Sequence, residues 1–327
     1  MPIFKQLHRF GFAQRAVMGL LLSASLISAV ITTGVLYVDP YNLWRAKPIS
    51  QDMSSLDRKM RFAKALQIYT RPIKTAFLGS STVYRGINPA DLPESLGAYN
   101  LGVSSLRATE IKSYVKALVE FCRPNDIVIG LDYFMFDRNR QTEAGFDSAI
   151  DEPLHATELL LQSLLGKDAI SDAVVVWRAR NKPTEDGIWL GNGFKKTFNR
   201  TEKEVQRIRF NTGNEYQAMV YDVALLLKIE SAIASMRSSG IKVHLYFSPV
   251  HAEFYQLISE SGQMENYQKF KNDIFSMAKR LGVSIHDFSD MQNSGDKLAG
   301  SNEHWIDITH YQPSTGEVMA KEILKLY

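Results

Sequence analysis

The sequence predicts an α/β protein in which a parallel sheet lies between layers of helices. Short apolar runs of strand length alternate with longer stretches of helical periodicity, between residues 73 and 131 and again from residue 216 onward. Strands separated by helices are typical of a parallel sheet with both faces covered. With 327 residues, of which 45% are hydrophobic, the chain is long enough for one large domain of this class.

The predicted strands are short apolar runs bounded by turn residues, at 73–78, 98–101, 127–131, 242–247 and 283–287. The predicted helices show apolar residues at helical spacing, at 55–69, 106–121, 216–236, 266–281 and from Pro313 onward. The alternation of strands and helices stops near residue 137 and resumes at residue 216. In the interval, an apolar helical stretch (159–177) precedes a polar run rich in glycine and asparagine. We interpret 138–215 as a mostly helical insertion whose role the sequence leaves open.

The N-terminal region contains 23 consecutive residues without a charge, at positions 16–38. A helix of this length spans the hydrocarbon core of a bilayer, which is about 30 Å thick. Lys5, Arg9 and Arg15 precede the run, so the positive-inside rule places residues 1–15 in the cytoplasm.

We therefore expect residues 16–38 to be an uncleaved signal anchor in the cytoplasmic membrane. A connector (39–72) and the α/β domain (73–327) would follow on the periplasmic or outer side. The alternative is a cleaved signal peptide, although the apolar region of such a peptide is usually only about 7–15 residues long.

The distribution of charge argues against a nucleic-acid partner. The formal net charge is +3, but three of the 38 basic residues precede residue 39, which leaves 35 basic residues against 35 acidic ones. The main domain thus has no excess charge to bind a phosphate backbone. The single cysteine, Cys122, excludes an intrachain disulfide and a thiolate metal cluster, and its place in an apolar pattern is typical of a small buried residue.

Two short motifs supply the groups that serine-dependent acyl transfer needs. Ser80 and Ser81 follow the first predicted strand, and Asp307 and His310 stand three residues apart near the C-terminus. A hydroxyl becomes a nucleophile when an imidazole takes its proton, and a carboxylate orients that imidazole. Each motif alone has another explanation, because the Gly79-Ser80-Ser81 turn or Asp307 can simply cap a following helix. The Gly-x-Ser-x-Gly motif of α/β-hydrolases is absent.

In their order along the chain, these motifs resemble the blocks of the SGNH/GDSL hydrolase superfamily. The first, second and last blocks correspond to Gly79-Ser80-Ser81, Tyr99-Asn100-Leu101-Gly102 and Asp307-x-x-His310, with Ser80 in place of the usual Asp. The resemblance implies a three-layer, flavodoxin-like fold and no cofactor.

The resemblance also implies roles for individual residues. Ser81 would be the nucleophile, His310 the general base and Asp307 its orienting acid. The oxyanion hole would be formed by the backbone N–H groups of Gly102 and Ser81, with the side chain of Asn100 as a further donor.

The third block departs from the family pattern. The family usually has Gly-x-Asn-Asp, with the Asn side chain in the oxyanion hole, whereas this chain has Gly130-Leu131-Asp132-Tyr133. An ionised Asp132 would repel an oxyanion, and the loss of one donor costs roughly 2.7–4 kcal/mol of transition-state stabilisation. Either Asn100 supplies the missing donor, or Asp132 has another role, or the hole is poor.

Other residues near these motifs, or beyond the ends of the predicted strands, are candidates for lining the pocket. They are Ser80, Tyr84, Arg85, Asp132, His251 and His304. His304, Asp307 and His310 also fit a metal site with two histidines and one carboxylate, but no further ligand cluster accompanies them, and we expect no metal.

The predicted anchor, the segment Val38-Asp39-Pro40-Tyr41 and the double serine resemble a membrane-anchored branch of the superfamily. That branch includes the alginate O-acetylation proteins and the D-alanyl-lipoteichoic-acid protein. The resemblance implies an esterase or O-acyltransferase that acts on a glycan or acylated polymer of the cell envelope, beside a multispanning O-acyltransferase. The alternative is a catalytically silent protein that binds glycan or scaffolds an assembly, and Asp132 favours this alternative.

Overall fold

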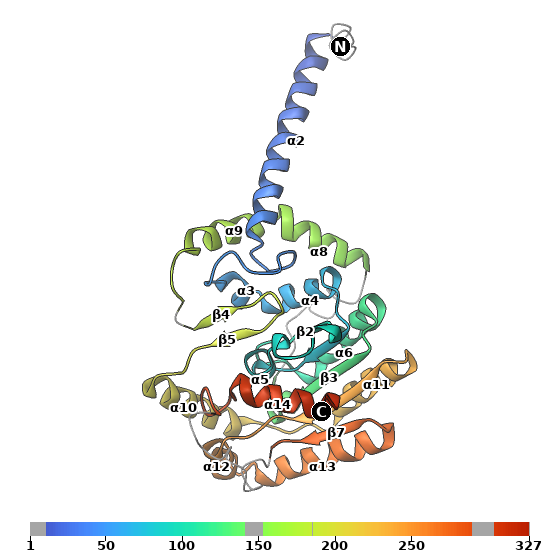
Figure 1. The fold of residues 1–327 in the computed structure, drawn as a ribbon, viewed down its shortest axis with the longest axis vertical. Coiled ribbons are helices and arrows are strands. Elements are labelled where there is room, and N and C mark those ends of the chain that lie inside the picture. The colour runs from blue at the N-terminus through green and yellow to red at the C-terminus, as the bar shows by residue number, and fades with distance from the viewer. Residues whose placement is uncertain (1–10, 141–152, 185, 290–303, 327) are drawn as a thin grey trace.

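The computed structural model describes residues 11–140, 153–184, 186–289 and 304–326 (Figure 1). Its centre is a five-stranded sheet whose strands are all parallel, in the order β2-β1-β3-β6-β7. The strands are β1 (Thr75–Leu78), β2 (Ala98–Asn100), β3 (Asp126–Leu131), β6 (Lys242–Phe247) and β7 (Ser284–Asp287). The predicted α/β class with a parallel sheet is confirmed, and each predicted strand is present to within two residues.

Helices cover both faces of this sheet because its strands are apolar on both sides. Phe77, Val128 and Tyr246 point toward one face, where they pack in one cluster with α5 (Ser81–Gly86) and α14 (Pro313–Leu324). The alternate strand residues belong to a larger cluster on the other face. That cluster includes side chains from α4 (Met60–Thr70), α6 (Ala108–Ala117), α11 (Ala224–Ser238), α12 (Ala252–Glu260) and α13 (Met264–Leu281).

The sheet order places a ligand site at a defined edge. Taking the five strands in chain order, the arrangement is 2-1-3-4-5, which reverses direction between β1 and β3. Parallel sheets of this order bind ligands beyond the carboxyl ends of the two strands at the reversal. β1 ends just before Ser80, and β3 ends just before Asp132.

The N-terminal helix α2 (Phe12–Val38) projects from the domain as a single long rod (Figure 1). Among the described residues it alone is long and apolar enough to cross a membrane. Its side chains are mostly exposed, and only Val35 and Val38 near its C-terminal end are buried. The connector that follows contains α3 (Ser54–Arg58) and α4, and it packs into the main core.

The predicted insertion is divided among three places. α8 (Pro153–Leu165) and α9 (Lys167–Ala179) contact α2. β4 (Gly187–Trp189) and β5 (Lys195–Thr197) form an antiparallel pair, and α10 (Glu202–Ala218) packs on α12.

The predicted helix at 216–236 is wrong in its first part, because α10 ends at Ala218 and α11 begins at Ala224. The intervening residues bond to a distant segment instead of continuing the helix. Val220 donates its N–H to the carboxylate of Asp137, and Tyr221 forms a β-bridge with the same residue. Asp222 then accepts the N–H of Ala224, the first residue of α11.

Candidate active site

The turn between β1 and α5 presents Ser81 at the carboxyl edge of the sheet. Ser80 caps α5 by accepting the backbone N–H of Thr82 at 3.2 Å, and Ser81 is the first residue of the helix. Gly79 has a φ of +156°, and a Cβ atom there would lie 2.4 Å from Cγ2 of Val83. The turn therefore requires glycine at this position.

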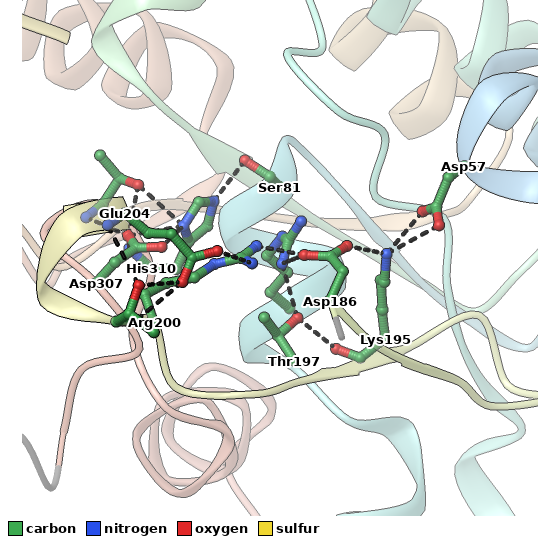
Figure 2. A network of polar contacts seen from close by, with 12 residues as sticks. Asp57, Ser81, Asp186, Lys195, Thr197, Arg200, Glu204, Asp307 and His310 are labelled. Atoms are coloured by element: carbon green, nitrogen blue, oxygen red, sulfur yellow. Dashed lines mark hydrogen bonds and ion pairs between the residues drawn. The ribbon is translucent and has the colours of Figure 1, made fainter. Parts of the chain in front are cut away.

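Ser81 is joined to His310 and Asp307 by a chain of two hydrogen bonds (Figure 2). Oγ of Ser81 lies 2.9 Å from Nε2 of His310, and Nδ1 of His310 lies 2.8 Å from Oδ2 of Asp307. A histidine that bonds a carboxylate through Nδ1 presents Nε2 as the atom able to take a proton. The structure thus brings the three side chains together, although Ser81 and His310 are 229 residues apart in the sequence.

The loop before α14 holds the Asp307 carboxylate rigidly. Oδ1 of Asp307 accepts the backbone N–H groups of Thr309, at 2.8 Å, and His310, at 3.0 Å. Burial acts to raise the pKa of Asp307. The His310 charge and the hydrogen bonds from His310 and Thr309 outweigh burial, and they hold this pKa below its usual range. Asp307 is therefore ionised at neutral pH and can stabilise a cationic His310.

A cavity of about 140 Å³ opens beside Ser81 and His310. Cavities of roughly 150 Å³ accommodate a molecule the size of benzene. One wall is formed by aromatic side chains of β6, α10, α12 and α13 and of the short 3-10 helix that follows β3, namely Tyr133, Phe134, Tyr216, Phe247, Phe254, Tyr267 and Phe270. The space beside the hydroxyl thus has the size and the lining for a short acyl chain.

Asp132 lines the same cavity from the end of β3. Its Oδ2 atom accepts hydrogen bonds from the hydroxyls of Ser80 and Thr82, the second at 3.1 Å. Burial is the largest influence and raises the pKa of Asp132, while the hydrogen bonds from Ser80, Ser248 and Thr82 offset it only in part. The environment therefore favours the neutral acid more than water does.

The side chain of Asn100, which we expected to be an oxyanion donor, has both of its amide hydrogens engaged elsewhere. Its amide donates both hydrogens inside the fold, to the carbonyls of Val83 at 2.8 Å and Ile87 at 2.7 Å. Its Oδ1 atom accepts the N–H of Gly102 at 2.9 Å, so this second expected donor is also engaged. Asn100 therefore ties β2 to α5. By contrast, the N–H of Ser81 stands at a helix N-terminus, where the first amides have no partner within the helix.

Six residues were candidates for lining the pocket. In the part of the chain that the structure describes, only Asp132 of these six lines the cavity. Ser80 lies directly behind it, bonded to Asp132. His251 caps α12 through Nδ1, and its ring lies edge-on to Trp305. The backbone carbonyl of His304 accepts the N–H of Gln312. Ser80, His251 and His304 therefore do not line this cavity.

Tyr84 and Arg85 do not line the cavity and bond to each other, with Nε of Arg85 donating to the Tyr84 hydroxyl at 3.2 Å. Tyr84 stacks on Trp189 of β4. Arg85 donates to Oγ1 of Thr197 at 2.9 Å and lies 3.6 Å from Asp186. Lys195 and Arg200 also bind Asp186, so this acidic group joins the β4–β5 pair to α5.

The sequence interpretation missed most of the cavity lining. Thr82 directly follows Ser81, so its position carried a signal, and Ser248 follows a predicted strand at the edge where the sequence places the ligand site. Tyr216 and Phe254 lie on helices that no sequence pattern places over the sheet edge. Their role depends on how α10 and α12 pack.

Comparison with known proteins finds distant structural matches and no match in sequence. No protein-family model matches the chain, and no curated protein matches it. A solved structure of a Bacteroides fragilis protein assigned as an acylhydrolase superposes with a TM-score of 0.44 and 11% sequence identity. The match covers 83% of this chain and 95% of that one.

Proposed function

We propose that the chain is a serine-dependent acyl-ester enzyme with Ser81 as nucleophile. The observation that carries the proposal is the continuous chain of hydrogen bonds from Ser81 through His310 to Asp307 at the mouth of a cavity. Three groups at these distances are what proton transfer during acyl transfer requires.

In the proposed reaction, His310 takes the proton of Ser81 as Oγ attacks the carbonyl carbon of an ester. The tetrahedral intermediate collapses, His310 gives this proton to the leaving alcohol, and the acyl group stays on Ser81. A second hydroxyl compound, deprotonated by His310, then attacks the acyl-enzyme, and the new intermediate collapses as His310 returns this proton to Oγ of Ser81, which releases the acyl product. Asp307 holds the imidazole in the required tautomer and stabilises its cation throughout.

The oxyanion of each intermediate needs hydrogen-bond donors. We assign one donor to the N–H of Ser81 at the start of α5. We assign a second to Asp132 in its neutral form, since a carboxylic acid kept protonated by its surroundings can donate a hydrogen bond to an oxyanion. The burial of Asp132 beside the nucleophile supports this role. The engagement of Gly102 and Asn100 within the fold is the reason that another donor is needed.

The proposal also covers the acceptor of the acyl group and the cellular location of the protein. Water as acceptor makes the protein an esterase, and a glycan hydroxyl makes it an O-acyltransferase. We propose that α2 anchors the chain in the cytoplasmic membrane and that the domain acts on an acylated envelope polysaccharide on the outer side, with a multispanning O-acyltransferase as partner. The supporting observation is the exposed apolar surface of α2. The ester-linked acyl content of envelope polymers in cells with Ser81→Ala would test the substrate class, because it should fall if the protein is a transferase and rise if it is an esterase.

One observation favours a second function. Gly102 and Asn100, the two donors expected besides Ser81, are both engaged within the fold. A catalytically silent protein that binds a glycan or scaffolds an assembly has no use for a free oxyanion hole. Under this alternative the cavity would bind ligand without turnover.

The decisive experiment treats the detergent-solubilised full chain with a fluorophosphonate and locates the adduct by mass spectrometry. The proposal requires an adduct on Ser81, none on its neighbour Ser80 and none in Ser81→Ala. Hydrolysis of p-nitrophenyl acetate should fall by a factor on the order of 10⁶ in kcat, or to background, in Ser81→Ala. Ser239→Ala, an exposed serine at the end of α11, is the matched control and should behave as the unmodified chain. A folded protein that forms no adduct would favour the silent alternative.

A further inference from the structure

The helices α8 and α9 spread to either side of the foot of α2, across its axis (Figure 1). Both helices contact α2, and α9 is fixed there by polar contacts with the segment that follows α2. The hydroxyl of Tyr41 donates to Asp172 of α9 at 2.8 Å, and Arg58 donates to the same carboxylate at 3.1 Å. Asp39 at the end of α2 accepts three backbone N–H groups of the following turn, each at 2.7 Å. The helix therefore joins the domain through a rigid connection rather than a flexible tether.

Both helices expose large apolar side chains. Leu161 and Leu165 lie one turn apart on α8 and are 54% and 49% exposed. Val174 and Trp177 share a face of α9 and are 44% and 40% exposed. Trp177 also contacts Tyr37 of α2, with ring centroids 6.0 Å apart, so the apolar surface of α9 is continuous with that of α2.

The length of α2 sets the depth of these helices. About 20 helical residues cover the 30 Å hydrocarbon core. Counted from residue 16, where the uncharged run begins, this span ends at Val35. Val35 is also the first buried residue of α2. The boundary between hydrocarbon and headgroups thus falls where the domain begins to cover α2, at the level of α8 and α9.

Basic side chains border this surface. Arg180 lies over the ring of Trp177, with its guanidinium carbon 3.8 Å from the ring centroid, and Arg45 lies over Tyr37 at 5.5 Å. Lys167, Arg178 and Lys182 are exposed on α9 or just after it. The neighbouring acid Asp168 is paired with Lys59 at 2.8 Å. Aromatic rings with a basic border are typical of helices at an anionic membrane surface.

From these contacts we infer that α8 and α9 form a platform that lies in the headgroup region of a bilayer containing anionic lipid, on the side where α2 emerges. The inference rests on α2 as a membrane anchor. The platform fixes the distance and the tilt of the α/β domain above the membrane, which a single spanning helix with a flexible tether does not do.

Spin labels on single cysteines test the inference in the full chain reconstituted into vesicles of phosphatidylcholine and phosphatidylglycerol. In a Cys122→Ser background, Leu161→Cys and Val174→Cys report on the platform. Leu227→Cys, 67% exposed on α11, is the control. The labels at 161 and 174 should collide more with oxygen than with a water-soluble nickel chelate, and the label at 227 should show the reverse. Pure phosphatidylcholine should reduce the difference.

Labels at 161 and 174 that are as accessible to the nickel chelate as the label at 227 would overturn the inference. Labels shielded from both reagents would also overturn it, because a second copy or a protein partner would then cover the surface. Flotation of the chain with the vesicles separates these outcomes from failure of the anchor itself, since a chain that does not float has no anchored platform. As a second readout, Trp177→Phe should lower tryptophan quenching by brominated lipid, and Trp305→Phe, at a buried position, should not.

Discussion

The hydroxyl of Ser80 donates a hydrogen bond to Oδ2 of Asp132, while the next residue, Ser81, bonds to His310. At the reversal point of the sheet, two adjacent serines are thus linked to two different carboxyl groups. Ser80 bonds directly to Asp132, and Ser81 is linked to Asp307 through His310. One acid, Asp307, is held ionised, whereas the surroundings of the other, Asp132, favour its neutral form. Two carboxyl groups with opposite pKa shifts in one site can carry out different tasks.

The raised pKa of Asp132 predicts a pH-dependent effect of Asp132→Asn on stability. Below the unfolded-state pKa, about 3.9, both states bind the proton and the carboxyl group costs nothing. As the pH rises through the raised folded-state pKa, the wild type loses stability that the neutral amide does not lose. Asp132→Asn should therefore raise the thermal midpoint at neutral pH, and the gain should vanish in acid.

The opposite shift at Asp307 supplies the control for this measurement. Because the folded-state pKa of Asp307 is lowered, its contribution to stability is present above about pH 3.9 and is lost as the pH falls through the folded-state value. Asp307→Asn should lower the thermal midpoint at neutral pH, by an amount that shrinks in acid. Two variants that shift in the same direction at neutral pH would contradict the assignment of charge.

The proposed donor role of Asp132 predicts a distinct pH profile of activity. When Asp132 ionises, a donor becomes a negative charge beside the forming oxyanion. The kcat/KM of the wild type should then fall as the pH rises above the raised pKa of Asp132. Asp132→Asn keeps an N–H donor at every pH, so its profile should lack this decline.

A full profile of kcat/KM against pH for both proteins, with one acetate ester, makes the comparison. Asp132→Ala removes the donor and should be slower than Asp132→Asn by roughly 10²- to 10³-fold, as for other oxyanion donors. Equal rates for the alanine and asparagine variants would refute a donor role for this position.

The turn that carries Gly102 should not tolerate a side chain. A Cβ atom there would lie 2.7 Å from the N atom of Tyr84 and 3.0 Å from the carbonyl oxygen of Ser80, both of which are backbone atoms. Gly102→Ala should lower the free energy of unfolding by about 1–3 kcal/mol, as overpacking usually does, and reduce fluorophosphonate labelling.

The control for this substitution is Gly213→Ala within α10, where a Cβ atom would meet only Cδ2 of Leu257 at 3.5 Å. Alanine is favoured over glycine inside a helix by up to about 1 kcal/mol, so Gly213→Ala should be neutral or stabilising. A similar loss of stability at both positions would mean that the close contact at Gly102 is not the cause.

Much of the fold follows from local patterns in the sequence. The runs before Gly79 and Asp132 are apolar throughout because both faces of the sheet are covered, and turn residues mark where they end. A parallel sheet places all such ends at one edge, which is why Ser81 can be expected near Asp132 from sequence alone. The pairing with His310 came from the order of the motifs, since spacing along the chain gives no distance across the fold.

Other features depend on contacts between distant segments. The break after α10 arises because Asp137 accepts the N–H of Val220, 83 residues away in sequence. The side-chain amide of Asn100 donates both of its hydrogens to carbonyls of α5 and of the residue after it. The spacing of residues along the sequence does not predict these contacts. The cavity itself exists because α10 and α12 bring Tyr216 and Phe254 over the sheet edge.

The cavity predicts a preference for acyl chain length that one substitution on α10 should change. Thr212 lines the cavity, whereas its neighbour Asn211 is exposed and does not line it. Thr212→Phe should fill space that a longer acyl chain occupies and leave room for an acetyl group. Each buried methylene contributes about 0.8 kcal/mol, so the kcat/KM for a butyryl ester relative to an acetyl ester should fall by up to roughly 15-fold.

Asn211→Phe adds the same ring to the same helix outside the cavity and should leave the butyryl-to-acetyl ratio unchanged. Comparing the ratio, rather than either rate, removes any general loss of folded protein. If Thr212→Phe reduces both esters equally, or if Asn211→Phe changes the ratio as much, then the acyl group does not lie in this cavity. The bound acyl chain would then have to extend from Ser81 toward the β4–β5 side, where Arg85 and Asp186 lie.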